Sequence, residues 1–163
     1  MEKYDVLMFS GAVSKGKFDY LPEVLDHLGV KKRFHKVQQR PGKPFWFGKK
    51  DRTTVFAYPG NPVSTYVSCL KYFFPWLVYS LKGEIETDNY AVLDRDFVFK
   101  PALTYFLQVQ LKNERGIVTA SPIAGNGSGD LANLTQNTAF MELPSNRSEF
   151  KKGAVFPVIS YRR

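Results

Sequence analysis

The chain has 163 residues, of which 44 % are hydrophobic and 15 % aromatic, a composition typical of a soluble globular protein with a real core. No run approaches the ~18 consecutive apolar residues of a membrane span, no signal arrangement is found near Met1, and a single cysteine, Cys69, excludes an internal disulfide framework. The net charge of +8 comes from short scattered clusters, so nucleic acid is not a favoured partner, and we expect a cytoplasmic protein without a membrane segment.

The first half of the chain has the pattern of alternating strands and helices. An apolar run before Ser10 is typical of a buried parallel strand. Asn61 is a favourable N-cap with Pro62 in the first helical turn, and Pro75 predicts a bend further along the same helix. We expect strands over 6–9, 45–48 and 53–58, a helix over 19–28, and a second helix from 62 to about 81.

The pattern changes after Gly83, because no long helix can be found beyond it. Short apolar runs follow instead, and Asn113 to Gly116 predicts a hairpin turn between two of them. We therefore expect an α/β domain over 1–83 and a small all-β domain, a barrel or a sandwich, over 84–163. The expected strands are 90–99, 104–112, 117–121, 139–143 and 154–160, with one helical turn at 131–136.

Two loops in the first half each lie where a strand hands over to a helix. The first runs from Ser10 to Tyr20 and the second from Tyr58 to Ser64. Such loops collect unpaired backbone N–H groups at the positive end of a helix dipole and so suit an anionic ligand. Between them lies the stiff basic turn Arg40-Pro-Gly-Lys43-Pro. The candidate anion-binding residues are Gly11, Ser14, Gly16, Arg40, Lys43, Pro59, Gly60, Asn61 and Pro62.

These residues predict a site for a phosphorylated small molecule. We expect Ser14, Arg40, Lys43 and Asn61 to converge at one edge of a parallel sheet, outside the carboxyl ends of its strands. Other interpretations of the same loops stay open. Gly11 to Lys17 reads G-x-x-x-x-G-K, but Phe18 stands where a nucleotide-binding P-loop needs Ser or Thr for magnesium. Either loop could also be a structural turn without a ligand, and Asp19 could simply cap the first helix.

The motifs resemble those of the molybdopterin molybdenumtransferase family (MoeA and gephyrin E-domain type). That family reads S-G-G-V-S-x-G-x-x-D-Y, then K-P-G-K-P, L-P-G-N-P-V-S and G-x-G-S-G, the last appearing here at 125–129. This chain departs from the pattern at Ala12 (glycine in the family), Arg40 (lysine) and Tyr58 (leucine). The family's N-terminal domains and its T-G-x-E-L segment have no counterpart. The resemblance therefore implies an incomplete, truncated three-layer α/β domain of the molybdopterin-binding type.

The resemblance also implies a function and roles for particular residues. The implied reaction is insertion of molybdate into adenylylated molybdopterin, with Mg²⁺ as cofactor and with a homo-oligomer as the working form. Asp19 and Lys43 are the implied catalytic residues, Asp19 also lying at the metal and nucleotide end of the cleft. Arg40 and Lys43 would contact molybdate or the pterin phosphate, and Ser128 would lie near molybdate.

Two other functions remain as alternatives. The chain could be a catalytically inactive molybdopterin- or anion-binding module or scaffold, or it could be related to pterin adenylyltransferases, against which residues 84–163 argue. Within the recognisable motifs only Asp19 offers a carboxylate. We therefore predict that the chain alone has little or no molybdenum-insertion activity.

Overall fold

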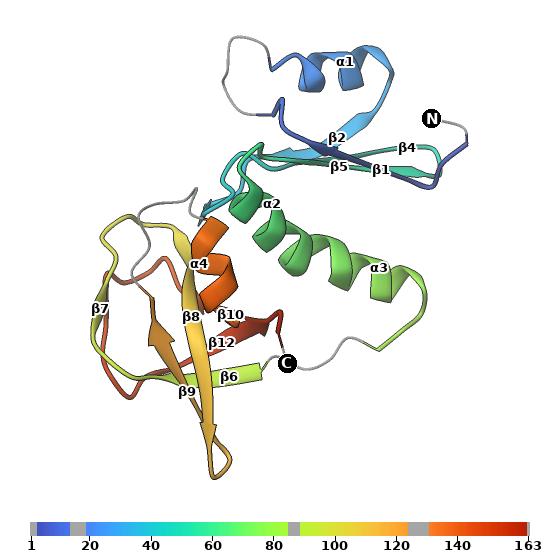
Figure 1. Ribbon diagram of the computed structural model, residues 1–163. Coiled ribbons are helices and arrows are strands. Elements are labelled where there is room, and N and C mark those ends of the chain that lie inside the picture. The colour runs from blue at the N-terminus through green and yellow to red at the C-terminus, as the bar shows by residue number, and fades with distance from the viewer. Residues whose placement is uncertain (1–2, 14–18, 85–88, 124–130, 163) are drawn as a thin grey trace.

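The computed structural model describes residues 3–13, 19–84, 89–123 and 131–162, and Figure 1 traces their elements. An α/β region is followed by a β-barrel, as the fold class predicted. The α/β region contains β1 (Val6–Ser10), α1 (Leu21–His27), β2 (Lys31–His35), β3 (Gln39–Arg40), β4 (Trp46–Lys50), β5 (Thr53–Tyr58), α2 (Pro62–Ser68), the π-helix η1 (Cys69–Phe73) and α3 (Phe74–Ser80). None of the described helices is long and apolar enough to cross a membrane.

The sheet of the α/β region has the order β1-β5-β4-β2 and forms the middle of three layers. Helix α1 covers one face, while α2, η1 and α3 cover the other (Figure 1). The predicted parallel sheet is wrong in detail, because only β1 and β5 run parallel. Strands β4 and β5 form a hairpin across the polar turn after Lys50, which forces them to be antiparallel, and β2 also pairs antiparallel with β4 after a longer connection.

The second helix changes its winding at the predicted place. Proline at 75 has no N–H to donate, so the regular ladder is interrupted in the turn before it. There the N–H of Phe74 reaches back to the carbonyl of Cys69, an i to i−5 bond that defines the π-helix. The helix therefore continues from 62 to 80 through a π-helical turn.

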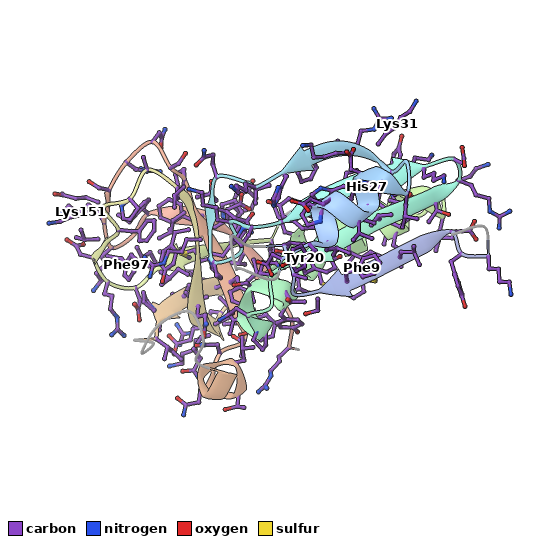
Figure 2. The ribbon with its side chains drawn as sticks, turned by 90° about the horizontal axis from the view of Figure 1, so that it is seen from above. Phe9, Tyr20, His27, Lys31, Phe97 and Lys151 are labelled. Carbon is purple, nitrogen blue, oxygen red and sulfur yellow. The ribbon has the colours of Figure 1, made fainter. Side chains whose placement is uncertain are left out.

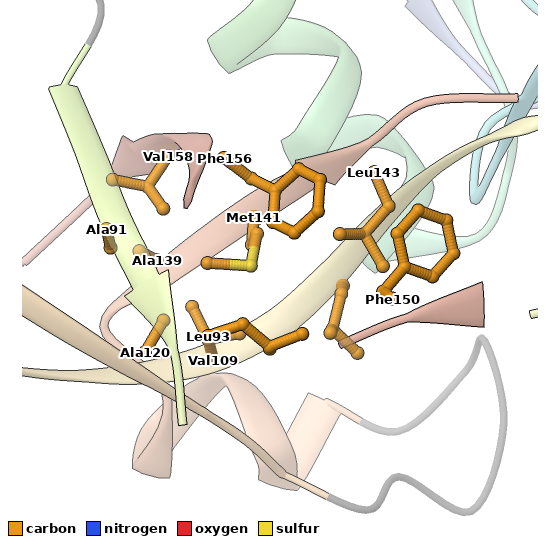
Figure 3. Close-up of a cluster of buried hydrophobic side chains, with 11 residues drawn as sticks. Ala91, Leu93, Val109, Ala120, Ala139, Met141, Leu143, Phe150, Phe156 and Val158 are labelled. Carbon is orange, nitrogen blue, oxygen red and sulfur yellow. The ribbon is translucent and has the colours of Figure 1, made fainter. Parts of the chain in front are cut away.

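The second half of the chain forms a closed barrel of strands β6, β9, β8, β10 and β12, in that order around the barrel, with β12 pairing back to β6. Its interior holds a continuous apolar cluster that includes Leu93, Val109 and Met141 (Figure 3). The elements are β6 (Asn89–Leu93), β7 (Phe97–Val98), β8 (Thr104–Glu114), β9 (Ile117–Pro122), α4 (Leu131–Gln136), β10 (Ala139–Leu143), β11 (Glu149–Phe150) and β12 (Val155–Ser160).

Two turns in the barrel region show how polar residues divide the strands. The predicted hairpin turn is confirmed: Arg115 and Gly116 both have positive φ, as a two-residue type I′ loop requires, and the Asn113 side chain accepts the N–H of Gly116 at 3.1 Å. The single strand predicted over 90–99 is wrong. Asp94 and Asp96 interrupt it, because their carboxylates accept hydrogen bonds from Ser121 and from the backbone N–H of Lys152.

The two regions are joined along a seam. Strand β3, which comes between β2 and β4 in the chain, pairs instead with the barrel, in parallel with β8 and with Arg40 opposite Tyr105. Helix α2 packs Val63 and Val67 against Phe106 and Phe140 of the barrel strands. The division into domains at 1–83 and 84–163 stays a prediction, and the elements on its two sides share this sheet pairing and this apolar cluster.

Candidate functional site

The two strand-to-helix loops lie side by side. Strands β1 and β5 pair in parallel register to their last residues, Ser10 opposite Tyr58. The next backbone N–H, of Gly11, donates to the carbonyl of Tyr58 at 2.9 Å. A Cβ atom on Gly60 would lie 3.5 Å from the Cα of Gly11, so the backbones of the two loops are in contact. The carboxyl ends of two parallel strands thus carry both loops, the position that favours ligand binding in α/β sheets.

The second loop has the geometry that its turn residues predict. Asn61 is the N-cap of α2, and its side-chain oxygen accepts both the N–H and the hydroxyl of Ser64, at 3.0 and 3.1 Å. The Thr65 hydroxyl donates to the carbonyl of Pro59 at 2.6 Å. Gly60 and Pro62 are exposed. Hydrogen bonds within the loop and the first turn of α2 therefore hold its conformation, and its exposed backbone is available to a ligand without rearrangement.

The basic turn packs against α2. Gly42 is buried and has a φ of +94°, and a Cβ atom there would lie 2.8 Å from the Gln39 amide nitrogen and 3.0 Å from the Ser68 hydroxyl. The peptide bond from Arg40 to the next residue, proline, is cis. The side chains of Arg40 and Lys43 remain exposed on either side of this anchored turn. Since α2 begins in the second loop, the three predicted motifs form one chain of contacts.

The first loop is described only in part. Ser14 and Gly16 lie outside the described residues, as does Ser128 of the glycine-rich loop. Asp19 is half-buried just before α1, whose N-cap is Tyr20, one residue later than predicted. Ala12, which stands where the family pattern has glycine, has a φ of +57°, in the left-handed region that glycine adopts most easily.

The structure adds residues that the sequence did not single out. His35 on β2 places its Nε2 3.0 Å from the carbonyl oxygen of Val13 and donates to it, which holds the buried start of the first loop. Gln39 is almost fully buried: its amide donates to the carbonyl of Pro41 at 3.0 Å, and its oxygen accepts the Tyr72 hydroxyl. The contacts from His35 to Val13 and from Tyr72 to Gln39 join residues 22 and 33 positions apart, so no local pattern indicated them.

An ion pair and two half-buried titratable groups lie along the seam. Lys71 of η1 pairs with Glu142 of β10 at 2.5 Å. Burial raises the pKa of Tyr72 to about 12, helped by the negative charge of Glu142. Tyr72 therefore stays protonated and donates to Gln39 across the neutral range. Burial likewise raises the pKa of the half-buried Cys69 thiol, which disfavours the reactive thiolate.

The remaining basic clusters do not form one surface. The cluster beginning at Lys31 and the pair Lys49-Lys50 lie on neighbouring strands β2 and β4, with Lys31 opposite Lys49. Figure 2 shows Lys31 and Lys151 at opposite ends of the molecule.

The family resemblance implies a magnesium ion, for which the chain would need a group of oxygen donors. Among residues 3–13, 19–84, 89–123 and 131–162, no group of three His, Cys, Asp or Glu side chains gathers to hold a metal ion. Mg²⁺ prefers several oxygen ligands in octahedral geometry. The described residues around Asp19 therefore do not fit a metal site by themselves.

Comparison with known proteins agrees with this geometry. Residues 1–78 match the family model described as a probable molybdopterin binding domain, and residues 90–161 match the MoeA C-terminal region, domain IV. The chain belongs to the MoeA family. The molybdopterin molybdenumtransferases of Synechocystis and Bacillus subtilis are 40 % and 30 % identical to it over 98 % and 99 % of this chain. A MoeA structure from Pyrococcus horikoshii superposes with a TM-score of 0.77 at 27 % identity, over 98 % of this chain and 38 % of that one.

This MoeA-family chain spans about two fifths of the length of those relatives, 39 % of the Synechocystis protein and 38 % of the Bacillus protein. The family resemblance and the fold class predicted from the sequence are confirmed. The chain is thereby related to proteins of molybdenum cofactor biosynthesis. The roles of individual site residues stay predictions.

Proposed function

We propose that this chain forms part of the cleft in which adenylylated molybdopterin and molybdate are brought together for molybdenum insertion. The observation that carries the proposal is the contact between Gly11 and Gly60 at the carboxyl ends of parallel β1 and β5. Two backbone loops that suit anions meet there. The basic turn packs on the helix that leaves the second loop, which adds Arg40 and Lys43 to the same part of the molecule.

The chemistry assigned to these residues is binding and orientation. Backbone N–H groups and the two cations would hold the phosphate and the oxyanion and offset their negative charge. No described residue is arranged as a covalent nucleophile. Because the donor set does not fit magnesium, no step is assigned to a metal held by this chain. Asp19 is proposed to face the nucleotide end of the substrate. A metal ion bound at that end would need further ligands from outside the described residues.

Binding of simple ligands tests the proposal. Isothermal titration calorimetry with AMP, a pterin phosphate and molybdate should show weak binding that falls as salt rises, because exposed cations dominate the site. Lys43→Ala should weaken binding about threefold to tenfold, the effect of one charge-assisted contact. The matched control is Lys152→Ala, which removes an exposed lysine from the far end of the barrel. Unchanged affinity for every ligand in Lys43→Ala would remove Lys43 from the site.

The second candidate function is a binding module without turnover. The lack of a carboxylate cluster among the described residues favours it for the chain acting alone. The decisive assay supplies adenylylated molybdopterin, molybdate and Mg²⁺ and follows AMP release. We expect little or no release, and a rate comparable with that of a full-length relative would show that the catalytic centre lies within this chain. An adenylyltransferase is disfavoured, because residues 90–161 match the MoeA C-terminal region.

A further inference from the structure

Arg40 lies above a stack of aromatic rings supplied by the barrel region. Its guanidinium carbon is 6.0 Å from the ring centroid of Phe99. Phe99 in turn stacks on Tyr105, with centroids 4.2 Å apart and the planes inclined by only 8°. Tyr105 is the register partner of Arg40 in the parallel pairing of β3 with β8. The backbone pairing therefore brings the arginine beside Tyr105 and within cation–π reach of Phe99.

The barrel core and a backbone hydrogen bond hold the two rings in place. Phe99 and Tyr105 are half-buried and pack against the apolar core of the barrel. The backbone N–H of Phe99 donates to the carbonyl of Ser148 at 2.9 Å, which fixes the segment after β7. Phe97 also stacks on Tyr105, with centroids 5.9 Å apart, but makes no cation–π contact with Arg40 among the contacts of the described residues. Phe97 is thus an aromatic neighbour of the stack that does not contact the arginine.

The geometry leaves the hydrogen-bonding edge of the arginine for a ligand. A guanidinium over a ring uses its flat face for the cation–π contact, while its N–H groups point outward in the plane. Arg40 is exposed, and within the described part of the chain no carboxylate forms an ion pair with it. A planar fork of this kind matches the oxygen spacing of a phosphate or a similar oxyanion. A lysine, the residue of the family motif here, has no flat face to stack and no fork to present.

We propose that Phe99, supported by Tyr105, is a positioning residue that holds the Arg40 guanidinium so that its edge binds an oxyanion through two parallel donors. This inference rests on the proposed function, since it assigns the anion-binding geometry of one residue of that site. It also gives a physical reason for arginine at a position where the family motif has lysine, because only a planar cation can stack its face on a ring and still present a two-donor edge.

The test compares Phe99→Leu and Arg40→Lys with their double variant, and uses Phe97→Leu as the matched control. Phe97→Leu removes a ring from the same stack without touching Arg40. The probes are inorganic phosphate, AMP and molybdate, each titrated at low salt and followed by calorimetry. The Arg40 side-chain N–H signal is followed by NMR, since a ring beneath it shifts that signal. Equal urea midpoints for Phe99→Leu and Phe97→Leu provide the check on folding.

We expect Phe99→Leu to abolish the ring-induced shift and to weaken phosphate binding about threefold to tenfold, with Arg40→Lys weakening it by a similar factor. The double variant should be no weaker than Arg40→Lys alone, because Phe99 acts only through the guanidinium. Phe97→Leu should retain both the shift and the affinity.

Several outcomes separate this inference from the proposed function. If the losses from Phe99→Leu and Arg40→Lys multiply, or if Phe97→Leu costs as much as Phe99→Leu, the positioning role is overturned. If AMP and molybdate bind and neither variant changes their affinity, the inference fails while the proposed function stands. If phosphate follows the expected pattern but AMP and molybdate do not bind, the positioning role is supported and the proposed function fails.

Discussion

The barrel and the α/β region use apolar strands in different ways. In the barrel each strand pairs with two neighbours, and a single cluster fills the interior. In the α/β region β5 is buried along its whole length, between helices on both faces. Strand β1 is equally apolar, yet it pairs only with β5 among the described strands, and Met8 is 46 % exposed. The barrel strands close on one another, whereas the α/β sheet ends in a strand whose sequence suits the interior of a sheet.

This difference indicates where the site obtains its rigidity. The loops of the candidate site follow β1 and β5 in the more open region. The basic turn, by contrast, is tied to the barrel through β3 and to α2 through Gly42. The barrel therefore supports a site whose loops belong mainly to the other region. Substitutions at the seam should cost more than similar substitutions within the barrel.

The largest effect is expected for Gly42→Ala. Its φ of +94° disfavours any side chain, and the new Cβ would meet Gln39 at 2.8 Å and Ser68 at 3.0 Å. We expect a loss of about 2–4 kcal/mol in the free energy of unfolding, measured by urea denaturation. The control Gly116→Ala has a similar φ of +86° but nothing within 4 Å, so about 1 kcal/mol is expected. Equal losses for the two variants would show that the seam is not tightly packed.

A smaller loss is expected for Tyr72→Phe, which removes one hydrogen bond across the seam. The oxygen of Gln39 is buried and would lose its donor from Tyr72. Leaving a buried acceptor without a partner costs about 1–3 kcal/mol. Tyr79→Phe is the control, because Tyr79 lies on the following helix and is 76 % exposed. A Tyr72→Phe protein as stable as the control would mean that water replaces the tyrosine hydroxyl.

Alkaline pH should weaken the seam through the same tyrosine. Burial raises the pKa of Tyr72, and separately that of Tyr161, from 10.0 to about 12. A pKa raised in the folded state gives stability that is complete below pH 10 and is lost as pH rises through about 12. Urea midpoints measured between pH 9 and 12 should therefore fall, and the fall should be shallower in Tyr72→Phe. A flat profile would show that these hydroxyls ionise in the folded protein as they do in water.

The sequence predicted the loops better than the contacts that support them. Asn61 and the hairpin at Asn113 were found because capping and turn residues act within a few positions of themselves. The mixed sheet was missed because strand direction depends on pairing: β1 is parallel to β5 as predicted, but β4 and β2 join the sheet antiparallel. The seam partners of Gln39 and the contact from His35 to Val13 join residues far apart in the chain. No local spacing could have indicated them.

The smallest effect is expected for Ala12→Gly, which restores the glycine of the family motif in the first loop. Ala12 has a φ of +57°, a conformation that costs a residue with a Cβ atom about 1 kcal/mol, although glycine regains part of this as chain entropy in the unfolded state. We expect a net gain of about 0.5 kcal/mol in urea denaturation. Arg115→Gly is the matched control in the barrel hairpin, where φ is +53°, and a similar gain is expected there. The two regions should differ in function, however, since only Ala12→Gly changes a loop of the candidate site and should alter AMP affinity. Stabilisation by both variants with no change in AMP binding by either would separate the first loop from the ligand site.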